Sequence, residues 1–548
     1  MSISRTHASE SLQQEVKKRR TFAIISHPDA GKTTLTEKLL MYGGAIRSAG
    51  TVKAKKSQQF ATSDWMEVEK QRGISVASSV MQFEHQGCVI NLLDTPGHQD
   101  FSEDTYRVLT AVDAALMVID AAKGVEAQTI KLLEVCRLRK TPVITFINKM
   151  DREVRDSLEL IDEIEDILGL PCAPITWPVG MGKEFAGVFD LGNNRMLKFT
   201  PGEDRPESDQ EVLDGEDHPY LVDNFPIAHA TFKEEVEIVR EAAATFDHDA
   251  FLKGELSPVF FGSAINNFGV QDILQALVSW APEPRPRMAR QREVMPDEAQ
   301  FSGIVFKIQA NMNPQHRDRI AFLRICSGEY RAGLKAKHVR SDKPIKLDHA
   351  INFMAQERGQ LSTAYAGDII GIPNHGRLRI GDVITQGEML ELVGIPHFSP
   401  EIFKTTRLND PLRAKQLNKA LKELGEEGTI QVFEPLEKTG MILGAVGQLQ
   451  FETVAHRLLT EYHIDVGFDN APIHTALWVH CDDLVTMKRF MQANANRLAR
   501  DAAGALAFMA PNRSVLDLTL EKWPDIDFDS TREVGAAPNS SASSRIPL

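Results

Sequence analysis

The chain has 548 residues and a formal net charge of −14 at pH 7. This length exceeds what one hydrophobic core serves, so we expect roughly three or four domains. Hydrophobic residues make up 42% of the chain and charged residues 25%, as in ordinary globular proteins. The negative charge argues against a nonspecific nucleic-acid coat protein, although a local basic face could still dock on RNA.

The sequence also argues against membrane and disulfide-rich classes. The longest apolar runs, such as 114–119, are far shorter than a membrane helix needs, and no signal-peptide segment precedes the first predicted strand. The five cysteines have no metal-ligand spacing, and their odd number argues against a disulfide framework. We therefore predict a protein of the reducing cytoplasm.

Residues 21–147 alternate between apolar runs and helical patterns. The runs are continuous, as expected of strands covered on both faces, and lie at 22–25, 89–93, 114–119 and 143–147. Helical patterns follow at 125–139 and 158–168. This alternation predicts an α/β domain with a parallel-type sheet. We assign 1–14 to an N-terminal arm, 15–285 to this domain and about 152–258 to an insertion, which includes a solvated acidic segment at 203–217.

A Pro-rich stretch at 282–286 marks the clearest domain boundary. Short β-rich runs between glycines then predict an antiparallel β-barrel at 290–390. Helical patterns at 412–424 and 448–460 alternate with a strand at 430–433, which predicts an α+β sandwich domain at 395–528. The remaining residues, 529–548, are rich in Ser, Ala and Pro and predict a disordered tail.

The segment between the first predicted strand and its helix has the character of a phosphate-binding P-loop. It comprises Ser26, His27, Pro28, Asp29, Ala30, Gly31, Lys32, Thr33 and Thr34. Backbone N–H groups at such a helix start bind phosphates. Lys32 would reach the β and γ phosphates, and Thr33 would ligate Mg²⁺. Ser26 replaces the usual first glycine, so for this loop alone a chance Gly-Lys-Thr stays an alternative.

Asn148, Lys149, Met150 and Asp151 directly follow the predicted strand 143–147. A carboxylate at Asp151 can accept hydrogen bonds from N1 and N2 of guanine, a donor pair that adenine lacks. Asn148 would brace the neighbouring loops, and Lys149 would lie over the base. The segment therefore favours GTP over ATP, although a polar turn explains the four residues alone.

Asp94, Thr95, Pro96, Gly97 and His98 form a third loop after a strand. An aspartate there holds Mg²⁺, usually through water. The Gly97 N–H can bond the γ-phosphate and sense hydrolysis. His98 is placed to orient or polarise the attacking water, whereas a histidine without this context would be read as a surface residue.

Two further segments complete the pattern. Ser75, within 72–75, can complete the Mg²⁺ shell when the γ-phosphate is present, as in the order–disorder switch of GTPases. Gly262, Ser263 and Ala264 follow a strand at 259–261, and a backbone N–H there could contact guanine O6, which is a weak signal. All five segments occur at one edge of the predicted sheet, where open α/β folds bind ligands.

On segments 26–34, 72–75, 94–98 and 148–151, the chain resembles a translational GTPase, the family of elongation-factor and release-factor GTPases that work on the ribosome. Residues 322–333 are similar to the second-domain barrel of that family, and 444–450 to its third domain. Three features favour the release-factor branch of this family. They are the sequence of the P-loop, the segment 63–67 that leads to 71–75, and a chain that stops after the third domain. The resemblance covers about residues 15–525.

The resemblance implies a function that composition does not. His98 would be the catalytic residue, positioned by ribosomal RNA, and GTP or GDP would bind with Mg²⁺ held by Thr33, Ser75 and Asp94. The protein would be a monomer that binds the ribosome, and neither membranes nor DNA, and promotes dissociation of codon-reading class I release factors in translation termination. The chain contains no Gly-Gly-Gln, so it would not itself cleave the peptidyl ester.

Three points stay open in the sequence. A truncated elongation-factor-like GTPase acting in ribosome recycling or rescue would share all of these nucleotide residues, and a nucleotide-binding scaffold without useful hydrolysis is a more distant alternative. Ribosome contact is expected from basic residues in the switch region and the third domain, although for any one of them a solvated face stays the alternative. These residues are Lys53, Lys55, Lys56, Lys404 and Arg413.

Overall fold

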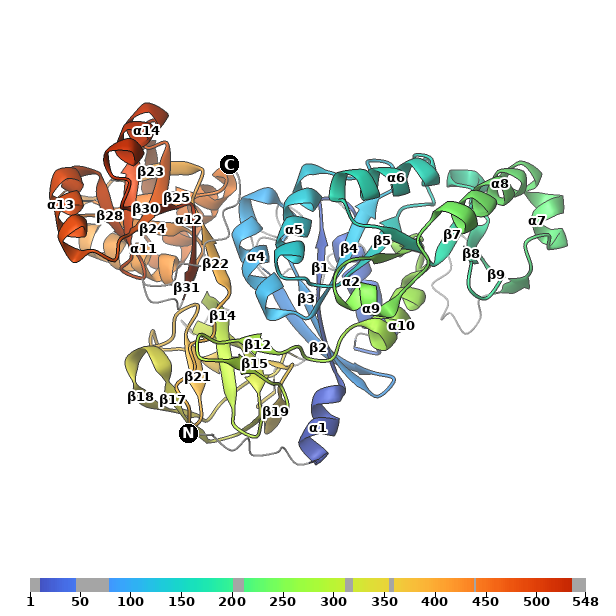
Figure 1. The fold of residues 1–548 in the computed structure, drawn as a ribbon, viewed down its shortest axis with the longest axis horizontal. Helices are drawn as coiled ribbons and strands as arrows, with labels where there is room; N and C mark the ends of the chain where they lie inside the picture. Colours follow the sequence, from blue (N-terminus) through green and yellow to red (C-terminus); the bar gives the residue numbers. More distant parts are fainter. Residues whose placement is uncertain are drawn as a thin grey trace.

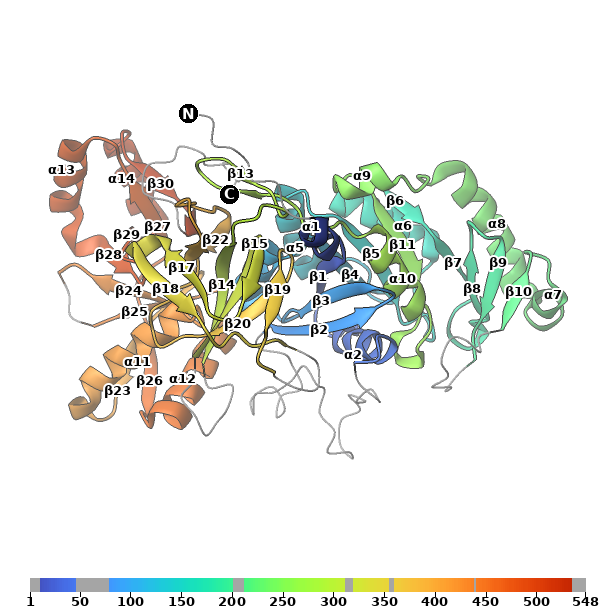
Figure 2. The same ribbon diagram turned by 90° about the horizontal axis from the view of Figure 1, so that it is seen from below.

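The computed structural model describes residues 10–45, 78–200, 211–310, 319–353, 359–437 and 440–534. They form an α/β domain that ends at residue 281, a barrel domain at 287–392 and a C-terminal domain at 395–534. The α/β domain lies in the middle of the molecule, with an insertion at one end and the C-terminal domain at the other (Figure 1, Figure 2). The barrel domain contacts both of the other domains.

The α/β domain contains a seven-stranded sheet of order β2-β3-β1-β4-β5-β11-β6. The strands are β1 (Arg19–Ser26), β2 (Ser79–His85), β3 (Cys88–Asp94), β4 (Ala114–Asp120), β5 (Val143–Asn148), β6 (Cys172–Pro174) and β11 (Ser257–Phe261). Every neighbouring pair is parallel except the β2–β3 hairpin. The predicted parallel-type sheet is confirmed.

Helices cover both faces of this sheet because successive strand residues point to opposite sides. Phe22 and Ile24 of β1 pack with the buried side chains of α2 (Lys32–Tyr42), α9 (His248–Leu252) and α10 (Val270–Trp280). Ala23 and Ile25 face the opposite cluster. That cluster includes residues of α4 (Ser102–Ala111), α5 (Ala127–Leu138) and α6 (Ser157–Leu168). The continuous apolar strands are therefore buried on both faces of the sheet, as the sequence indicated.

The insertion is a separate antiparallel sheet of order β10-β9-β8-β7. Its elements are β7 (Thr176–Val179), β8 (Gly187–Asp190), β9 (Arg195–Lys198), β10 (Val212–Asp214), α7 (Pro219–Asn224) and α8 (Pro226–Ala242). Phe189 packs on Phe232 of α8 with ring centroids 5.1 Å apart. The insertion is shorter than the predicted 152–258, because α6 and β6 belong to the main fold and β6 pairs with β11.

The barrel domain is antiparallel throughout, as predicted. The domain opens with a short hairpin of β12 (Arg287–Met288) and β13 (Glu293–Val294). Its strands are β14 (Ser302–Ala310), β15 (Arg319–Ser327), β16 (Glu329–Arg331), β17 (Leu334–His338), β18 (Lys343–Leu347), β19 (Thr363–Tyr365), β20 (Ile369–Pro373) and β21 (Val383–Thr385). Phe322 stacks on Phe353 at 4.6 Å in its core.

The C-terminal domain mixes helices with an eight-stranded antiparallel sheet of order β26-β23-β25-β24-β28-β29-β27-β30. Its strands are β22 (Ile395–Phe398), β23 (Ile402–Leu408), β24 (Gln431–Pro435), β25 (Ile442–Ala445), β26 (Val466–Asn470), β27 (Thr475–His480), β28 (Leu498–Asp501), β29 (Leu506–Ala510), β30 (Asp527–Asp529) and β31 (Thr531–Val534). Its helices are α11 (Ala414–Glu426), α12 (Gln448–Tyr462), α13 (Leu484–Asn494) and α14 (Arg513–Lys522). The α+β prediction is confirmed.

The two predicted ends of the chain differ from the structure. The predicted tail, 529–548, is wrong at its start because β31 pairs with β22, which places residues 531–534 in the fold. Residues 535–548 lie outside the described part. The predicted arm, 1–14, runs into helix α1 (Glu10–Lys17), whose Gln13 donates to Asp297 near the barrel domain at 3.3 Å.

Buried ion pairs hold the barrel domain against the α/β domain. Asp113, which is 2% exposed, pairs with Arg324 of β15 and with Arg287 at 3.2 Å. Arg19 of β1 donates to Asp368 at 3.2 Å. Within the described ranges, no helix is both long and apolar enough to cross a membrane.

Candidate nucleotide-binding site

The P-loop is a tight turn between the end of β1 and the start of α2. Two of its residues have left-handed backbone conformations, Asp29 with φ 65° and Gly31 with φ 97°. A Cβ atom at Gly31 would overlap the side-chain amide of Asn148. Glycine is therefore required here twice, for the backbone conformation and for the close approach of a neighbouring loop.

Lys32 and Asp94 are buried side by side at the bottom of this loop. The Lys32 Nζ lies 2.5 Å from Asp94 Oδ1, and their side chains are 6% and 2% exposed. Thr36 also donates to Asp94 Oδ1, at 3.2 Å. The predicted phosphate-binding cation and the predicted Mg²⁺-binding carboxylate thus lie within reach of one another.

Two buried polar atoms in the loop, Ser26 Oγ and His27 Nδ1, have no hydrogen-bond partner among the described residues. Buried polar groups without partners are costly, so each calls for a ligand or water. Together with the left-handed backbone and the buried Lys32, they fit a site for a phosphate-bearing ligand. The residues present are therefore compatible with GTP or GDP.

His27 is also tied to the next loop of the site. Its Nε2 lies 3.1 Å from Glu126 Oε1, just before α5. Burial lowers the pKa of His27, and the Glu126 carboxylate opposes that shift. His27 therefore joins the P-loop to the start of α5, a contact that the sequence alone does not indicate.

Asn148 connects three loops with one amide. Its Nδ2 donates to the Ala30 carbonyl at 2.8 Å. Its Oδ1 accepts from the N–H groups of Ala264 and Lys149, both at 2.9 Å. The bracing that the sequence predicted for Asn148 is therefore present, between the P-loop, the segment 148–151 and the segment 263–264.

Lys149 and Asp151 contact different neighbouring loops. Lys149, with φ 77°, donates from Nζ to the Asp29 carbonyl and to Asp120 Oδ2, the latter at 2.7 Å. Asp151 Oδ1 accepts from the Ser263 hydroxyl at 2.5 Å. The side chain of Met150 is fully buried in the core, so only its backbone could contribute to a ligand site.

The loop 94–98 follows β3 and lies against the P-loop. The Thr95 hydroxyl donates to the Ile24 carbonyl at 2.7 Å, and Gly97 faces the backbone of Pro28. His98, whose side chain is 29% exposed, accepts at Nδ1 from the Asp100 N–H at 3.2 Å. This loop is therefore fixed by the P-loop on one side and by η1 (Gln99–Phe101) on the other.

The structure thus brings together four of the five predicted segments: 26–34, 94–98, 148–151 and 263–264. They follow the carboxyl ends of β1, β3, β5 and β11, which share one edge of the sheet. The fifth, 72–75 with Ser75, lies outside the described residues, as do Lys53, Lys55 and Lys56. All five cysteines belong to the described part of the chain and are free.

Two carboxylates near this site were missed in the sequence. Asp120 ends β4 and pairs with Lys149, and its position after an apolar strand is the same signal that singled out Asp94. Asp100 contacts a residue 349 positions away, and no local pattern indicates that.

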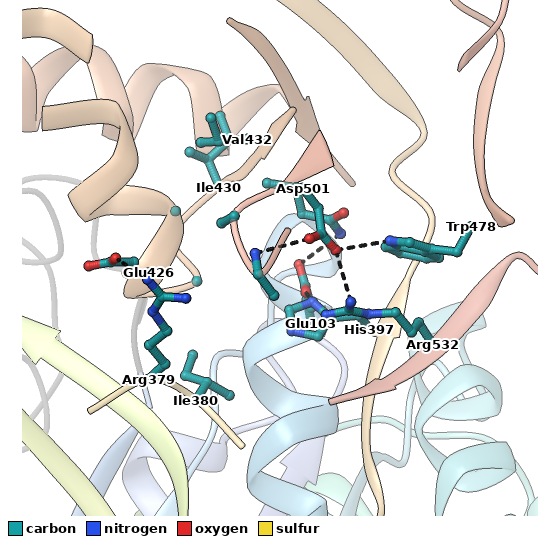
Figure 3. Close-up of a pocket in the computed structure, with 15 residues that line it drawn as sticks. Glu103, Arg379, Ile380, His397, Glu426, Ile430, Val432, Trp478, Asp501 and Arg532 are labelled. Atoms are coloured by element: carbon teal, nitrogen blue, oxygen red, sulfur yellow. Dashed lines mark hydrogen bonds and ion pairs between the residues drawn. The ribbon is translucent and has the colours of Figure 1, made fainter. Parts of the chain in front are cut away.

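A small cavity of about 60 Å³ lies away from this site, where the three domains meet (Figure 3). Glu103 of α4 projects into it, with Arg379 from the barrel domain and Trp478, Asp501 and Arg532 from the C-terminal domain. Its walls are largely engaged with one another: Trp478 donates to Asp501 at 3.0 Å, and Glu103 lies 2.9 Å from His397 Nδ1. It is a junction between domains, separate from the P-loop.

Family models match the three domains in order. Residues 17–283 match the elongation factor Tu GTP binding domain, 300–387 match elongation factor G domain 2, and 392–520 match the C-terminal domain of class II release factor RF3.

Whole-length relatives agree with these matches. Peptide chain release factor 3 of Aromatoleum aromaticum is 62% identical over 529 residues, which is 96% of this chain and 96% of that protein. The protein of the same name from Bordetella pertussis is 58% identical over 525 residues, 96% of this chain and 98% of that protein. A crystal structure of a Thermus thermophilus protein shares the fold, with a TM-score of 0.67 and 24% identity over 85% of this chain and 69% of that chain.

Proposed function

The chain belongs to the peptide chain release factor 3 family of translational GTPases, and we therefore propose which of its residues carry that activity. The protein hydrolyses GTP and acts as a release factor 3 in translation termination. The observation that supports the residue roles best is the convergence of four loops on Asn148 and the P-loop.

The phosphates of GTP are proposed to bind the backbone N–H groups of 26–34, with Lys32 moving from Asp94 to the β and γ phosphates. The buried, partnerless atoms of Ser26 and His27 support a polar ligand at this position. Thr33 and Asp94, with Ser75, would hold Mg²⁺, and bound Mg²⁺ would neutralise phosphate charge.

Guanine selection is proposed to rest on Asp151. Its carboxylate is oriented by the Ser263 hydroxyl at 2.5 Å and would accept from guanine N1 and N2. The Ala264 N–H, which donates to Asn148 Oδ1 at 2.9 Å in this structure, would turn to guanine O6, and Lys149 would cover the base. Because a carboxylate cannot donate, a base lacking this donor pair would leave it unpaired, which is costly.

Hydrolysis is proposed to depend on His98. His98 Nδ1 lies 3.2 Å from the Asp100 N–H and 3.3 Å from Asp100 Oδ1, and these contacts leave Nε2 on the other side of the ring. That atom would orient the water that attacks the γ-phosphate, giving GDP and phosphate. Contact with the ribosome is proposed to complete this geometry.

The output is proposed to be dissociation of a codon-reading class I release factor from the ribosome after peptide release. The protein would act as a monomer in the cytoplasm, where its five free cysteines would stay reduced. Docking on ribosomal RNA is proposed to involve the exposed basic face that runs from Arg413 into α11. Its residues Lys415, Lys419 and Lys422 are exposed, and the Lys419 side chain is 80% exposed.

Lys404 donates to Gln448 at 2.7 Å and lies over the Phe451 ring, and Arg413 donates to the His463 carbonyl, so the more exposed lysines of α11 are the stronger candidates for this contact. Replacement of Arg413, Lys415 and Lys419 by alanine should weaken ribosome binding and reduce its salt dependence. A matched triple variant at the exposed acidic residues Glu159, Asp162 and Asp166 of α6 serves as the control. Unchanged affinity in the basic-face variant would contradict this docking surface.

The test of function is the rate at which a labelled class I factor leaves ribosomes after peptide release. The protein with GTP should accelerate departure, and His98→Ala should bind the same complexes without supporting repeated turnover. If departure is not accelerated while ribosome-stimulated GTP hydrolysis is intact, the output is instead a recycling or rescue step.

A further inference from the structure

Helix α12 of the C-terminal domain begins without a capping side chain of its own. The first N–H groups of a helix have no partner within the helix, and a Ser, Thr, Asp or Asn at the N-cap usually accepts from them. The residue at this position is Gly447. Gln450 accepts from the N–H groups of Val446 and Gly447, at 2.8 and 3.3 Å, but the N–H of Leu449, the second residue of the helix, needs another acceptor.

Asp100 of the α/β domain supplies that acceptor. Its Oδ2 accepts from the Leu449 N–H at 2.6 Å, and Asp100 is only 6% exposed. A carboxylate at this position also meets the positive end of the helix dipole. Asp100 therefore occupies the place of an N-cap side chain although it belongs to another domain, 349 residues away.

The contact with Asp100 explains why residue 447 is a glycine, whereas its backbone conformation does not require one. Its φ of −142° and ψ of 167° are extended values that any residue adopts. A Cβ atom there would overlap the Asp100 carboxylate. The absence of a side chain on α12 and the presence of a carboxylate on the loop are thus complementary.

Asp100 is at the same time a backbone neighbour of the proposed catalytic residue. Its N–H donates to His98 Nδ1 at 3.2 Å, so one residue links the imidazole ring to the start of α12. Other contacts between α4 and the C-terminal domain exist, such as Gln431 to Glu103 at 3.3 Å and Arg107 to the Gly428 carbonyl at 3.0 Å. Glu103 lies at the domain junction in Figure 3, and neither of these contacts involves His98.

We propose that Asp100 caps helix α12 in trans and thereby couples the position of the C-terminal domain to the orientation of His98. Asp100 is a positioning residue in this scheme, and the second half of the proposal rests on the proposed role of His98. Withdrawal of α12 leaves the Asp100 carboxylate without its N–H donor and frees the backbone segment that holds His98 Nδ1. Displacement of the His98 loop conversely uncaps α12.

The first half is tested on the free, full-length protein by hydrogen–deuterium exchange of the α12 first turn, residues 448–451. Loss of an N-cap weakens a helix start by about fivefold in its opening equilibrium, so Asp100→Ala should speed this exchange by about that factor. Gly447→Ala should do the same, since its methyl group displaces the carboxylate. Unchanged exchange in Asp100→Ala would overturn the capping role, whatever the protein does on the ribosome.

The second half is tested by a double variant, Asp100→Ala with Gly447→Ser. Serine fills the space that Asp100 vacates and caps α12 from its own chain, so slow exchange at 448–451 should return. Asp100→Ala should lower the kcat of ribosome-stimulated GTP hydrolysis and leave KM unchanged, and an unchanged kcat would overturn the coupling. The double variant should stay equally slow, because the link to His98 is still absent. Gln431→Ala, which removes a neighbouring contact of α4, should hydrolyse GTP like the parent protein.

Recovery of kcat in the double variant would show that Asp100 acts only through helix stability and would overturn the coupling. Loss of kcat in Gln431→Ala equal to that in Asp100→Ala would do so as well. Failure of ribosomes to stimulate the unmodified protein would instead contradict the proposed function, and the exchange experiment would still decide the capping role.

Discussion

Removal of the Asp113 carboxylate should separate the α/β domain from the barrel domain. Asp113 follows α4, and its side chain is 1% exposed. Its Oδ2 pairs with Arg324, while its Oδ1 lies 3.2 Å from Arg287 and accepts the Arg285 N–H at 3.2 Å. The Arg324 side chain is 2% exposed; burial lowers its pKa, and Asp113 opposes that shift.

The magnitude follows from the charge left behind. In Asp113→Ala, the Arg324 guanidinium keeps a hydrogen bond to the Gly367 carbonyl but loses the carboxylate with which it pairs. Removing one partner of a buried ion pair costs about 3–5 kcal/mol. That is a large part of the roughly 5–15 kcal/mol by which a folded domain is stable.

Thermal unfolding and limited proteolysis of the full chain measure this effect. For domains of this size, the loss corresponds to a fall in Tm of roughly 10 °C, with faster cleavage in the linker 282–286. Asp217→Ala is the control, because Asp217 is exposed and its pairing with Lys233 at 2.9 Å should not affect Tm. A fall of less than about 2 °C in Asp113→Ala would refute the reasoning, since it would mean that the Arg324 charge finds another partner at little cost.

Three further changes have defined outcomes. Asp151→Asn should shift nucleotide preference from guanosine toward xanthosine nucleotides in competition binding, and retained GTP preference would contradict the base-reading role. Gly31→Ala should lower nucleotide affinity at least about tenfold in a fluorescent-GDP titration, because the new Cβ overlaps Asn148 and the backbone has φ 97°; unchanged affinity would show that the loop relaxes freely. Burial, with the nearby Asp190 carboxylate, raises the pKa of Asp272 to about 6. Protonation therefore favours the folded state, and its contribution is lost as pH rises from about 4 through about 6. Asp272→Asn should raise Tm above pH 6 and leave it unchanged near pH 4, and an equal shift at both pH values would exclude this origin.

The main sheet could be predicted because its strands are apolar on both faces. The runs 22–25, 89–93, 114–119 and 143–147 each lie within one strand of the structure. Strand β1 begins earlier than predicted, at Arg19, because polar residues there face the barrel domain. Thr21 donates to the Gly367 carbonyl at 2.7 Å, a contact 346 residues away that no local pattern reveals.

Prediction from the sequence fails where a strand or side chain pairs with a residue far away in the chain. Strand β31 falls in the predicted tail because its partner, β22, lies far earlier in the chain and its residues Thr531–Val534 carry no strong apolar pattern. Strand β6 has three residues and ends in a proline, so its sequence does not distinguish it from the predicted insertion. Asp120 and Asp100 were overlooked because their partners come together only in the folded protein.

The loops proposed to bind nucleotide could be identified from the sequence, because the residue types that mark them lie close together in the chain. Lys32, Asp94 and Asn148 each follow or precede a strand in the required order, and parallel strands bring their carboxyl ends to one edge. What the sequence could not give is their mutual geometry, such as the Asn148 amide between Ala30 and Ala264.

The most direct test of His98 as the catalytic residue is GTP hydrolysis by the purified protein, with and without ribosomes, beside His98→Ala. We expect strong stimulation by ribosomes in the unmodified protein and its loss in His98→Ala, with GTP binding unchanged in both. Equal stimulation of the two proteins would contradict the role of His98, and no stimulation of either would contradict ribosome-dependent hydrolysis itself.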